Sequence, residues 1–233
     1  MRSTRTGSRH PRRPEPRSSR CGAVAPPRAR PGPPLATARD DGGVVTEGIF
    51  TILVVCSGNI CRSPVAEQLL RDRLSGIAGV QVHSAGTIAR PGVPMTDQAI
   101  ELSQRYGGQP DGHMSRPLTA ALIEGADLVL TAERSHRADV ARLHPRASRF
   151  AFTLTQFARM IDSIEPDALA KITSPQELVA AAAARRGYVQ ASSPEADDIA
   201  DPYRRSQSVY DAAGASIDGA VTSIAAAFPR PVS

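Results

Sequence analysis

Two cysteines and an arginine lie close together in the stretch VCSGNICRSP, which begins at Val55. A thiolate is a strong nucleophile, and an arginine guanidinium can bind two phosphate oxygens at once. The residues between Cys56 and Arg62 are mostly small or polar, as in loops whose backbone amides surround an oxyanion. This combination predicts a cysteine that attacks phosphorus while the loop and the arginine hold the phosphoryl group.

The elements on either side of this loop support that chemistry. Residues 49–55 are a β-branched apolar run, typical of a strand buried on both faces of a parallel sheet. Ser63 and Pro64 then start a helical pattern that stops near Gly76. A helix N-terminus after a buried strand directs amides at an anion and favours a thiolate, whereas an inert thiol is the alternative for Cys56. We predict that the phosphate is bound by Ser57, Gly58, Asn59, Ile60, Cys61 and Arg62.

An acid is also needed if the leaving group is a phenolate. Asp201 in DDIADPYRRS is a candidate, because the following proline fixes the turn in which it lies. Asp-Pro is common in ordinary turns, so Asp201 becomes a candidate acid only in combination with the loop.

The remaining chain alternates strand and helix patterns. Strands are predicted at 80–84, 126–131 and 150–153, and helices at 95–106, 133–143 and 206–227, with two more helical patterns within 154–190. Such alternation predicts an α/β fold with a parallel sheet. Ligands of these folds bind beyond the carboxyl ends of the strands, which is where Cys56 lies.

Composition limits the remaining possibilities. Three cysteines, an odd number, do not suggest a disulfide framework, so a reducing, cytoplasmic compartment is expected. No apolar run reaches the roughly 18 residues of a membrane span. The net charge of +5 divides into +9 over residues 1–39 and −4 over the remainder, so the body of the chain is not expected to bind nucleic acid.

The chain is expected to divide into a tail and one domain. Residues 1–47 are rich in arginine and proline and poor in large apolar side chains, which predicts a disordered tail. Three interpretations of this tail are open: an electrostatic arm for membrane or nucleic acid, a transit-like peptide, or a start assigned too far upstream. Residues 48–233 are predicted to form the folded domain.

Several motifs together resemble the low-molecular-weight protein tyrosine phosphatases. They are VCSGNICRSPVAE, SAGT from Ser84, ADLVLTAERSHR and DPYRRSQSVYDA, in this order along the chain. The resemblance runs from about residue 49 to the C-terminus, excluding most of 154–195. It implies a three-layer fold with a four-stranded parallel sheet, helices on both faces and the phosphate-binding loop after the first strand. It also implies hydrolysis of phosphotyrosine in proteins through a phosphocysteine, without metal or other cofactor.

The same resemblance implies roles for individual residues. Cys56 corresponds to the nucleophile, Arg62 to the phosphate clamp and Asp201 to the general acid and then base. Asn59 resembles the loop asparagine with a left-handed backbone, which asparagine tolerates. The residues implied as its support, or as support of the thiolate, are Ser63, Ser84 and His113. From the residues alone, Ser63 is equally a helix N-cap.

Two departures from the family pattern concern the substrate. After SAGT, where many members have an aromatic residue, this chain has Ile88-Ala89-Arg90-Pro91. Residues 154–195 are also longer than the family core requires and are interpreted as a helical insertion. The missing aromatic and the DPYRRS ending resemble the bacterial branch associated with tyrosine kinases of exopolysaccharide export. Phosphotyrosine proteins, including such a kinase, are therefore the expected partners.

Two other functions compete with this interpretation. Thioredoxin-coupled arsenate reductases have a similar loop. They need further cysteines downstream of it, and no cysteine follows Cys61 in this chain. A non-catalytic phosphopeptide-binding module could use the loop without turnover. The joint presence of Cys56, Arg62 and Asp201 argues against such a module.

Overall fold

A four-stranded parallel sheet forms the centre of the computed structural model, which describes residues 48–110 and 112–230. The strand order is β2-β1-β3-β4. The strands are β1 (Phe50–Cys56), β2 (Val80–Gly86), β3 (Leu128–Thr131) and β4 (Ala151–Thr153). The predicted tail, residues 1–47, lies outside the described residues.

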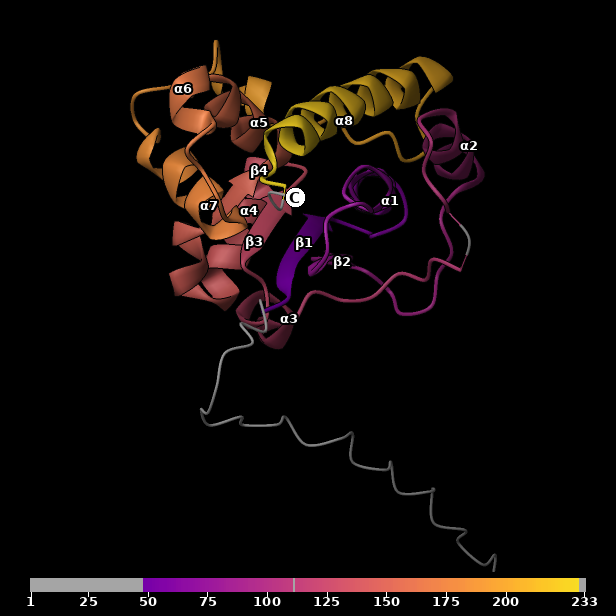
Figure 1. Ribbon diagram of the computed structural model, residues 1–233. Coiled ribbons are helices and arrows are strands. Elements are labelled where there is room, and N and C mark those ends of the chain that lie inside the picture. The colour runs from indigo at the N-terminus through magenta and orange to yellow at the C-terminus, as the bar shows by residue number, and fades with distance from the viewer. Residues whose placement is uncertain (1–47, 111, 231–233) are drawn as a thin grey trace, which may run out of the picture. The chain divides into compact units, whose positions relative to one another are not determined.

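Helices follow the strands in the expected alternation (Figure 1). The longer helices are α1 (Arg62–Arg73), α2 (Asp97–Arg105), α4 (Arg134–Leu143), α5 (Leu154–Asp162), α7 (Pro175–Ala184) and α8 (Gln207–Ala227). The short helices are α3 (Ala120–Glu124) and α6 (Pro166–Leu169), and the 3-10 turns are η1 (Pro145–Arg149) and η2 (Pro194–Asp197). The short elements were not predicted, because fewer than two helical turns leave no clear periodicity.

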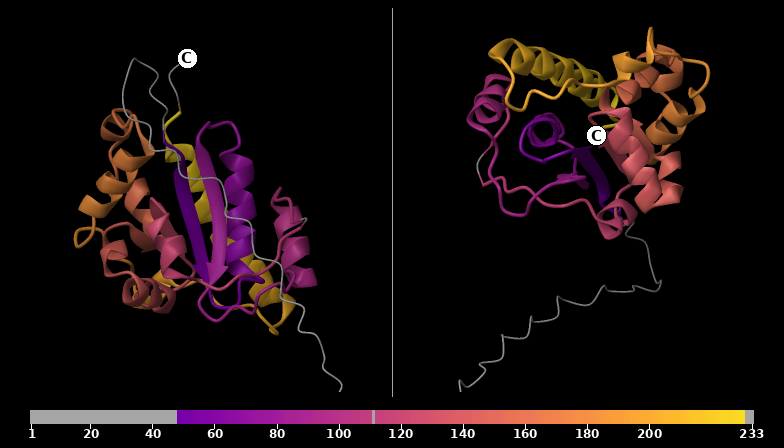
Figure 2. Two further views of the ribbon diagram at one scale, coloured as in Figure 1. Left: turned by 90° about the horizontal axis from the view of Figure 1, so that it is seen from below. Right: turned by 180° about the vertical axis from the view of Figure 1, so that it is seen from behind.

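Helices cover both faces of the sheet, as Figure 2 shows from below. Alternate residues of β1 face opposite sides, so Ile52 and Val54 join one apolar cluster while Leu53 and Val55 join another. The first cluster includes side chains of α1, α5 and α8, and the second includes side chains of α3 and α4. The predicted three-layer α/β fold is confirmed.

The segment 154–195 is helical, as its pattern predicts. It contains α5, α6 and α7 and ends within η2. Helix α7 begins with a capping box, in which the side chains of Ser174 and Glu177 bond each other's backbone N–H. Buried residues of α5 and α7 extend the apolar cluster that contains α8. The interpretation of this segment as an insertion stays a prediction.

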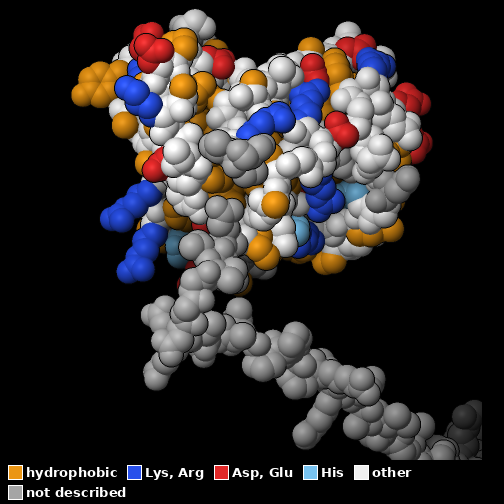
Figure 3. Space-filling model, viewed as in Figure 1, with side chains coloured by type: hydrophobic (Ala, Val, Ile, Leu, Met, Phe, Trp, Pro, Cys, Tyr) orange, Lys and Arg blue, Asp and Glu red, His pale blue; other side chains and the backbone are white. Residues whose placement is uncertain are grey.

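The outer surface carries side chains of mixed type on the face drawn in Figure 3. Basic, acidic and apolar side chains of the described residues are interspersed there. In the described part of the chain, no helix has both the length and the apolar character needed to cross a membrane.

The end of β2 is packed directly against the loop that follows β1. Gly86 pairs with Cys56 across the sheet, and its N–H donates to the carbonyl of Arg116. A Cβ atom at Gly86 would clash with the carbonyl oxygen of Ser57 and lie 2.9 Å from the amide nitrogen of Asn59. The loop can therefore approach β2 this closely only because residue 86 is glycine.

Substitution of Gly86 tests this close approach. Gly86→Ala should lower the free energy of unfolding by about 1–3 kcal/mol, because the added methyl group overpacks the loop. It should also reduce turnover of p-nitrophenyl phosphate. Gly219→Ala is the matched control, since that glycine lies in α8 with nothing near its Cβ position, and it should be neutral or stabilising by up to about 1 kcal/mol. The free energy of unfolding of both variants is measured by denaturant titration. Equal stability of the two variants would show that a methyl group at position 86 does not overpack the loop.

Candidate active site

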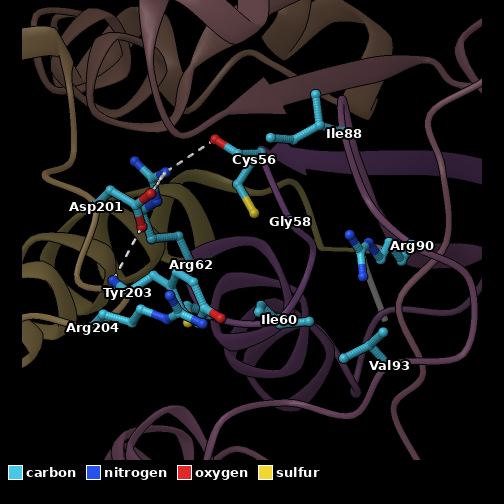
Figure 4. A pocket seen from close by; sticks show the side chains of 12 residues that line it. Cys56, Gly58, Ile60, Arg62, Ile88, Arg90, Val93, Asp201, Tyr203 and Arg204 are labelled. Carbon is cyan, nitrogen blue, oxygen red and sulfur yellow. Dashed lines mark hydrogen bonds and ion pairs between the residues drawn. The ribbon is translucent and has the colours of Figure 1, made fainter.

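The loop between β1 and α1 forms the floor of a cavity of about 440 Å³ at the carboxyl end of β1. Figure 4 shows Cys56 and Gly58 between two walls: Asp201, Tyr203 and Arg204 on one side, and Ile88, Arg90 and Val93 on the other. The sequence elements that supply the walls are far apart in the chain. The cavity therefore brings together the predicted loop and the predicted acid.

The Cys56 sulfur is buried at the end of β1 and is surrounded by hydrogen-bond donors. Its Sγ atom accepts a bond from the backbone N–H of Asn59 at 3.3 Å and lies 2.9 Å from the hydroxyl of Ser63. Helix α1 begins at Arg62 with Cys61 at the N-cap position, so the interpretation of Ser63 as the N-cap is wrong. Its hydroxyl instead faces the sulfur, where a donor stabilises a thiolate.

The loop backbone is held with its carbonyls turned outward. The carbonyl of Ser57 accepts from the N–H of Ile88 at 3.0 Å, and the carbonyl of Ile60 accepts from the N–H of Thr96 at 3.1 Å. Within the described chain, the N–H groups of Gly58, Ile60 and Cys61 have no acceptor. A buried loop with free amides and bonded carbonyls is built to receive an anion.

Asn59 fixes this loop conformation. Its backbone has a φ of 55°, in the left-handed region, and its side chain is completely buried. The side-chain amide donates to the hydroxyls of Ser84 at 2.7 Å and Ser63 at 3.0 Å. The side-chain oxygen of Asn59 accepts from the backbone N–H of Arg116 at 2.9 Å. The backbone carbonyl oxygen of Asn59 lies 2.9 Å from Nε2 of His113. The three residues predicted as support therefore all contact Asn59.

A buried carboxylate ties these supports together. Glu67 of α1 accepts from the hydroxyl of Ser84 and pairs with Arg71 at 2.5 Å. Its Oε2 also lies 3.7 Å from Nδ1 of His113. Glu67 and Arg116 were not predicted as site residues, because nothing in their sequence spacing relates them to Asn59.

Arg62 lies almost entirely inside the protein, with 2% of its side chain exposed. One terminal nitrogen donates to the carboxylate of Glu133 and, at 2.7 Å, to the carbonyl of Ile199. The other lies 3.3 Å from the carboxylate of Asp201. Its Nε is buried without an acceptor among the described residues. A buried guanidinium N–H with no protein partner is what a phosphate oxygen would satisfy.

Glu133 and His136 are site residues that the sequence did not single out, although both lie in the motif ADLVLTAERSHR. Burial alone would raise the pKa of Glu133, but the hydrogen bond and positive charge of Arg62 outweigh it and lower that pKa. His136 lies 2.8 Å from the hydroxyl of Ser57, and burial lowers its pKa. An ionised Glu133 thus pairs with the guanidinium of Arg62 away from the cavity lining. The neighbouring imidazole of His136 is favoured in its neutral form.

Asp201 lies at the cavity wall with its side chain half exposed. Its carboxylate accepts from the N–H of Tyr203 at 3.3 Å, and the buried Pro202 fixes the turn between them. Tyr203 supplies an aromatic ring to the cavity from this turn. This chain therefore lacks an aromatic ring after SAGT but has one, that of Tyr203, on the opposite wall of the cavity.

The second cysteine of the loop has different surroundings. The Cys61 sulfur lies 3.4 Å from the hydroxyl of Thr96 and 3.8 Å from that of Tyr210. Burial raises its pKa, which disfavours the thiolate. Both thiols line the cavity, but among the described residues only the Cys56 sulfur accepts a hydrogen bond from a backbone N–H of the loop.

The parallel sheet and the cysteine–arginine loop after its first strand define an α/β protein of the cysteine-dependent phosphatase type. The sequence model of the family described as low molecular weight phosphotyrosine protein phosphatase matches residues 51–169. The chain belongs to this family.

Similar proteins include both tyrosine and arginine phosphatases. The probable low molecular weight protein-tyrosine-phosphatase EpsP of Ralstonia nicotianae is 40% identical over 106 residues, which are 46% of this chain and 71% of EpsP. The protein-arginine-phosphatase of Bacillus subtilis is 38% identical over 109 residues, 46% of this chain and 71% of that protein. The crystal structure of Vibrio vulnificus Wzb with benzylphosphonate superposes with a TM-score of 0.56 at 27% identity, covering 77% of this chain and 99% of Wzb.

Replacing Glu133 tests its part in holding Arg62. Glu133→Gln keeps the size of the side chain but removes the charge, so the guanidinium should lose its fixed position. We expect kcat/KM for p-nitrophenyl phosphate to fall by up to about 100-fold and inorganic phosphate to inhibit more weakly. Glu195→Gln is the control, because Glu195 is exposed and pairs with Arg134 away from the cavity.

The same variant has a pH signature. Because the pKa of Glu133 is lower in the folded protein than in the unfolded chain, its ionised form stabilises the fold above the ordinary pKa of about 4.3. That stabilisation is lost as the pH falls through the folded pKa. The stability difference between the parent and Glu133→Gln should therefore be largest near neutral pH and shrink below about pH 4. A difference that is independent of pH would contradict the ion pair.

Proposed function

We propose that this chain hydrolyses phosphotyrosine in proteins through a phosphocysteine on Cys56. The observation that carries the proposal is the buried Nε of Arg62, which has no acceptor among the described residues and belongs to the loop that holds the Cys56 sulfur. Free loop amides and this N–H would bind the phosphoryl oxygens above the thiolate. Membership in the phosphatase family supports the same activity.

The first step would transfer the phosphoryl group to sulfur. The Cys56 thiolate attacks phosphorus, an S–P bond forms, and the bond from phosphorus to the tyrosine oxygen breaks. Asp201 gives its proton to the departing phenolate. In the second step Asp201 takes a proton from water, the water oxygen attacks phosphorus, and the S–P bond breaks to release phosphate and the thiolate.

The cavity supports tyrosine as the phosphorylated residue. Cys56 lines this cavity but is only 2% exposed, so a long phosphotyrosine side chain should reach its sulfur more readily than a short phosphoserine side chain. The walls offer Ile60, Val93 and the ring of Tyr203 to a phenyl group.

Phosphoarginine is the alternative substrate to consider, because one relative is the protein-arginine-phosphatase of Bacillus subtilis. A guanidinium leaving group would need carboxylates along the walls. The cavity is lined by Arg90 and Arg204, and the one carboxylate that the described residues supply to it, Asp201, already faces Arg62. These charges favour a neutral aromatic group over a cationic one.

The chain's organisation and setting are proposed on the same basis. Residues 48–233 form the catalytic domain, with a helical insertion at about 154–195, none of whose described side chains lines the cavity. The proposed setting is the cytoplasm. The proposed partners are phosphotyrosine proteins, including a bacterial tyrosine kinase of exopolysaccharide export, because EpsP is among the relatives and the ring after SAGT is missing.

The nucleophile is tested by replacing each loop cysteine in turn. Cys56→Ser should abolish turnover of a phosphotyrosine peptide while vanadate still binds, because the loop amides and Arg62 remain. Cys61→Ser should keep measurable turnover, and a chelator should leave the parent unaffected. The assay includes phosphoserine, phosphothreonine and phosphoarginine peptides. Turnover that survives in Cys56→Ser, or that prefers another phosphorylated residue, would overturn the proposal.

The role of Asp201 is tested through the leaving group. A general acid contributes roughly 10²–10⁴-fold, and most to leaving groups that hold their proton tightly. Asp201→Asn should therefore slow phenyl phosphate far more than p-nitrophenyl phosphate. Asp198→Asn is a control, since that carboxylate pairs with Arg134 rather than facing the cavity. Equal losses on both substrates would show that Asp201 only shapes the turn.

A further inference from the structure

We infer that Arg90 and Arg204 form a cationic rim that selects phosphotyrosines flanked by acidic residues. This inference rests on the proposed function, because it concerns the residues on either side of the phosphotyrosine that the cavity would bind. Both side chains are exposed and line the cavity. Figure 4 shows them on opposite sides of Cys56.

The charge of the rim is not balanced by the protein. Other arginines of the described residues are neutralised by an acidic neighbour: Arg62, Arg71, Arg73, Arg105, Arg134, Arg142 and Arg159 each contact a carboxylate. Among the described residues, neither Arg90 nor Arg204 has an ion pair or a side-chain hydrogen bond. The cavity's own carboxylate, Asp201, faces Arg62. Two unpaired guanidinium groups at one opening form a site for anionic groups beyond the phosphate itself.

The backbone of Arg204 supports a specific placement of its side chain. Its φ is 59°, a left-handed conformation that L-residues other than glycine and asparagine adopt rarely. The turn is closed by the N–H of Arg205, which donates to the carbonyl of Pro202 at 2.9 Å. This conformation sets the guanidinium 5.1 Å from the ring centre of Tyr203, at the edge of the cavity. Residues held in such conformations cluster at ligand-binding positions.

The geometry of an extended peptide is compatible with arginines on two opposite walls of the cavity. In an extended chain the residues on either side of the phosphotyrosine run away from it in opposite directions, at about 3.3 Å per residue. Side chains alternate between two faces, so those two positions before and two positions after the phosphotyrosine point toward the protein with it, each about 7 Å along the chain. An aspartate or glutamate on either side could then meet Arg90 on one wall and Arg204 on the other. Because both arginines are exposed, each contact is weak and is screened by salt.

The test compares phosphotyrosine peptides that differ only in flanking charge. The parent should prefer a peptide with acidic flanks over a neutral one by about 2- to 5-fold in kcat/KM for each contact at low salt. The preference should shrink in 0.5 M salt. It should also shrink in Arg90→Gln and in Arg204→Gln, and reverse toward basic flanks when both residues are replaced by Glu. Arg205→Gln is the matched control, because this neighbouring arginine does not line the cavity, and it should keep the preference.

The outcomes separate this inference from the proposed function. If the parent turns over neither peptide, the proposed phosphatase activity fails. If it turns over both peptides equally, or if the preference survives in the double Glu variant, the rim does not read flanking charge. Equal losses on acidic and neutral peptides in the Gln variants would also overturn the inference, because the arginines would then act on the phosphate alone.

Discussion

The left-handed backbone of Asn59 is the constraint on which the site depends. That conformation turns the loop carbonyls toward Ile88 and Thr96 and leaves the amides facing the cavity. It is disfavoured for an L-residue, and it persists because every polar group of the buried amide side chain is bonded. The supports come from α1, β2 and the segment before α3, so the loop is fixed only when these three parts are packed together. Stability and phosphate binding are therefore coupled in this protein.

The second constraint is the charge of Arg62. A guanidinium with 2% exposure needs anionic or carbonyl partners, and Glu133 and Ile199 supply them from behind the cavity. These contacts leave Nε unpaired. Asp201 faces the same guanidinium from the cavity side, where a phosphate oxygen would compete for it. Asp201 and the loop residue Ser57 thus both lie next to a single buried guanidinium.

Much of this could be predicted from local patterns. The strand and helix order follows from the period of apolar residues, and motifs with fixed spacing led to Cys56, Arg62 and Asp201 as the proposed nucleophile, clamp and acid. Glu133, His136 and Arg116 could not be found this way, because their importance comes from contacts made across the sheet. Of the two interpretations of Ser63, the N-cap is wrong and the contact with Cys56 is present: its hydroxyl lies against the Cys56 sulfur, and Cys61 occupies the N-cap position. The ring of Tyr203 was likewise visible in the sequence but not its place opposite Ile88.

Trapping the phosphorylated intermediate shows whether Cys56 itself carries the phosphoryl group. The Asp201→Asn variant, whose second step lacks its base, is mixed with a ³²P-labelled phosphotyrosine peptide, stopped within milliseconds by denaturation, and digested for peptide mapping. The account predicts label on the peptide that contains Cys56, in an amount approaching one phosphate per enzyme. Label on another residue, or a burst of dephosphorylated peptide without any labelled enzyme, would contradict it.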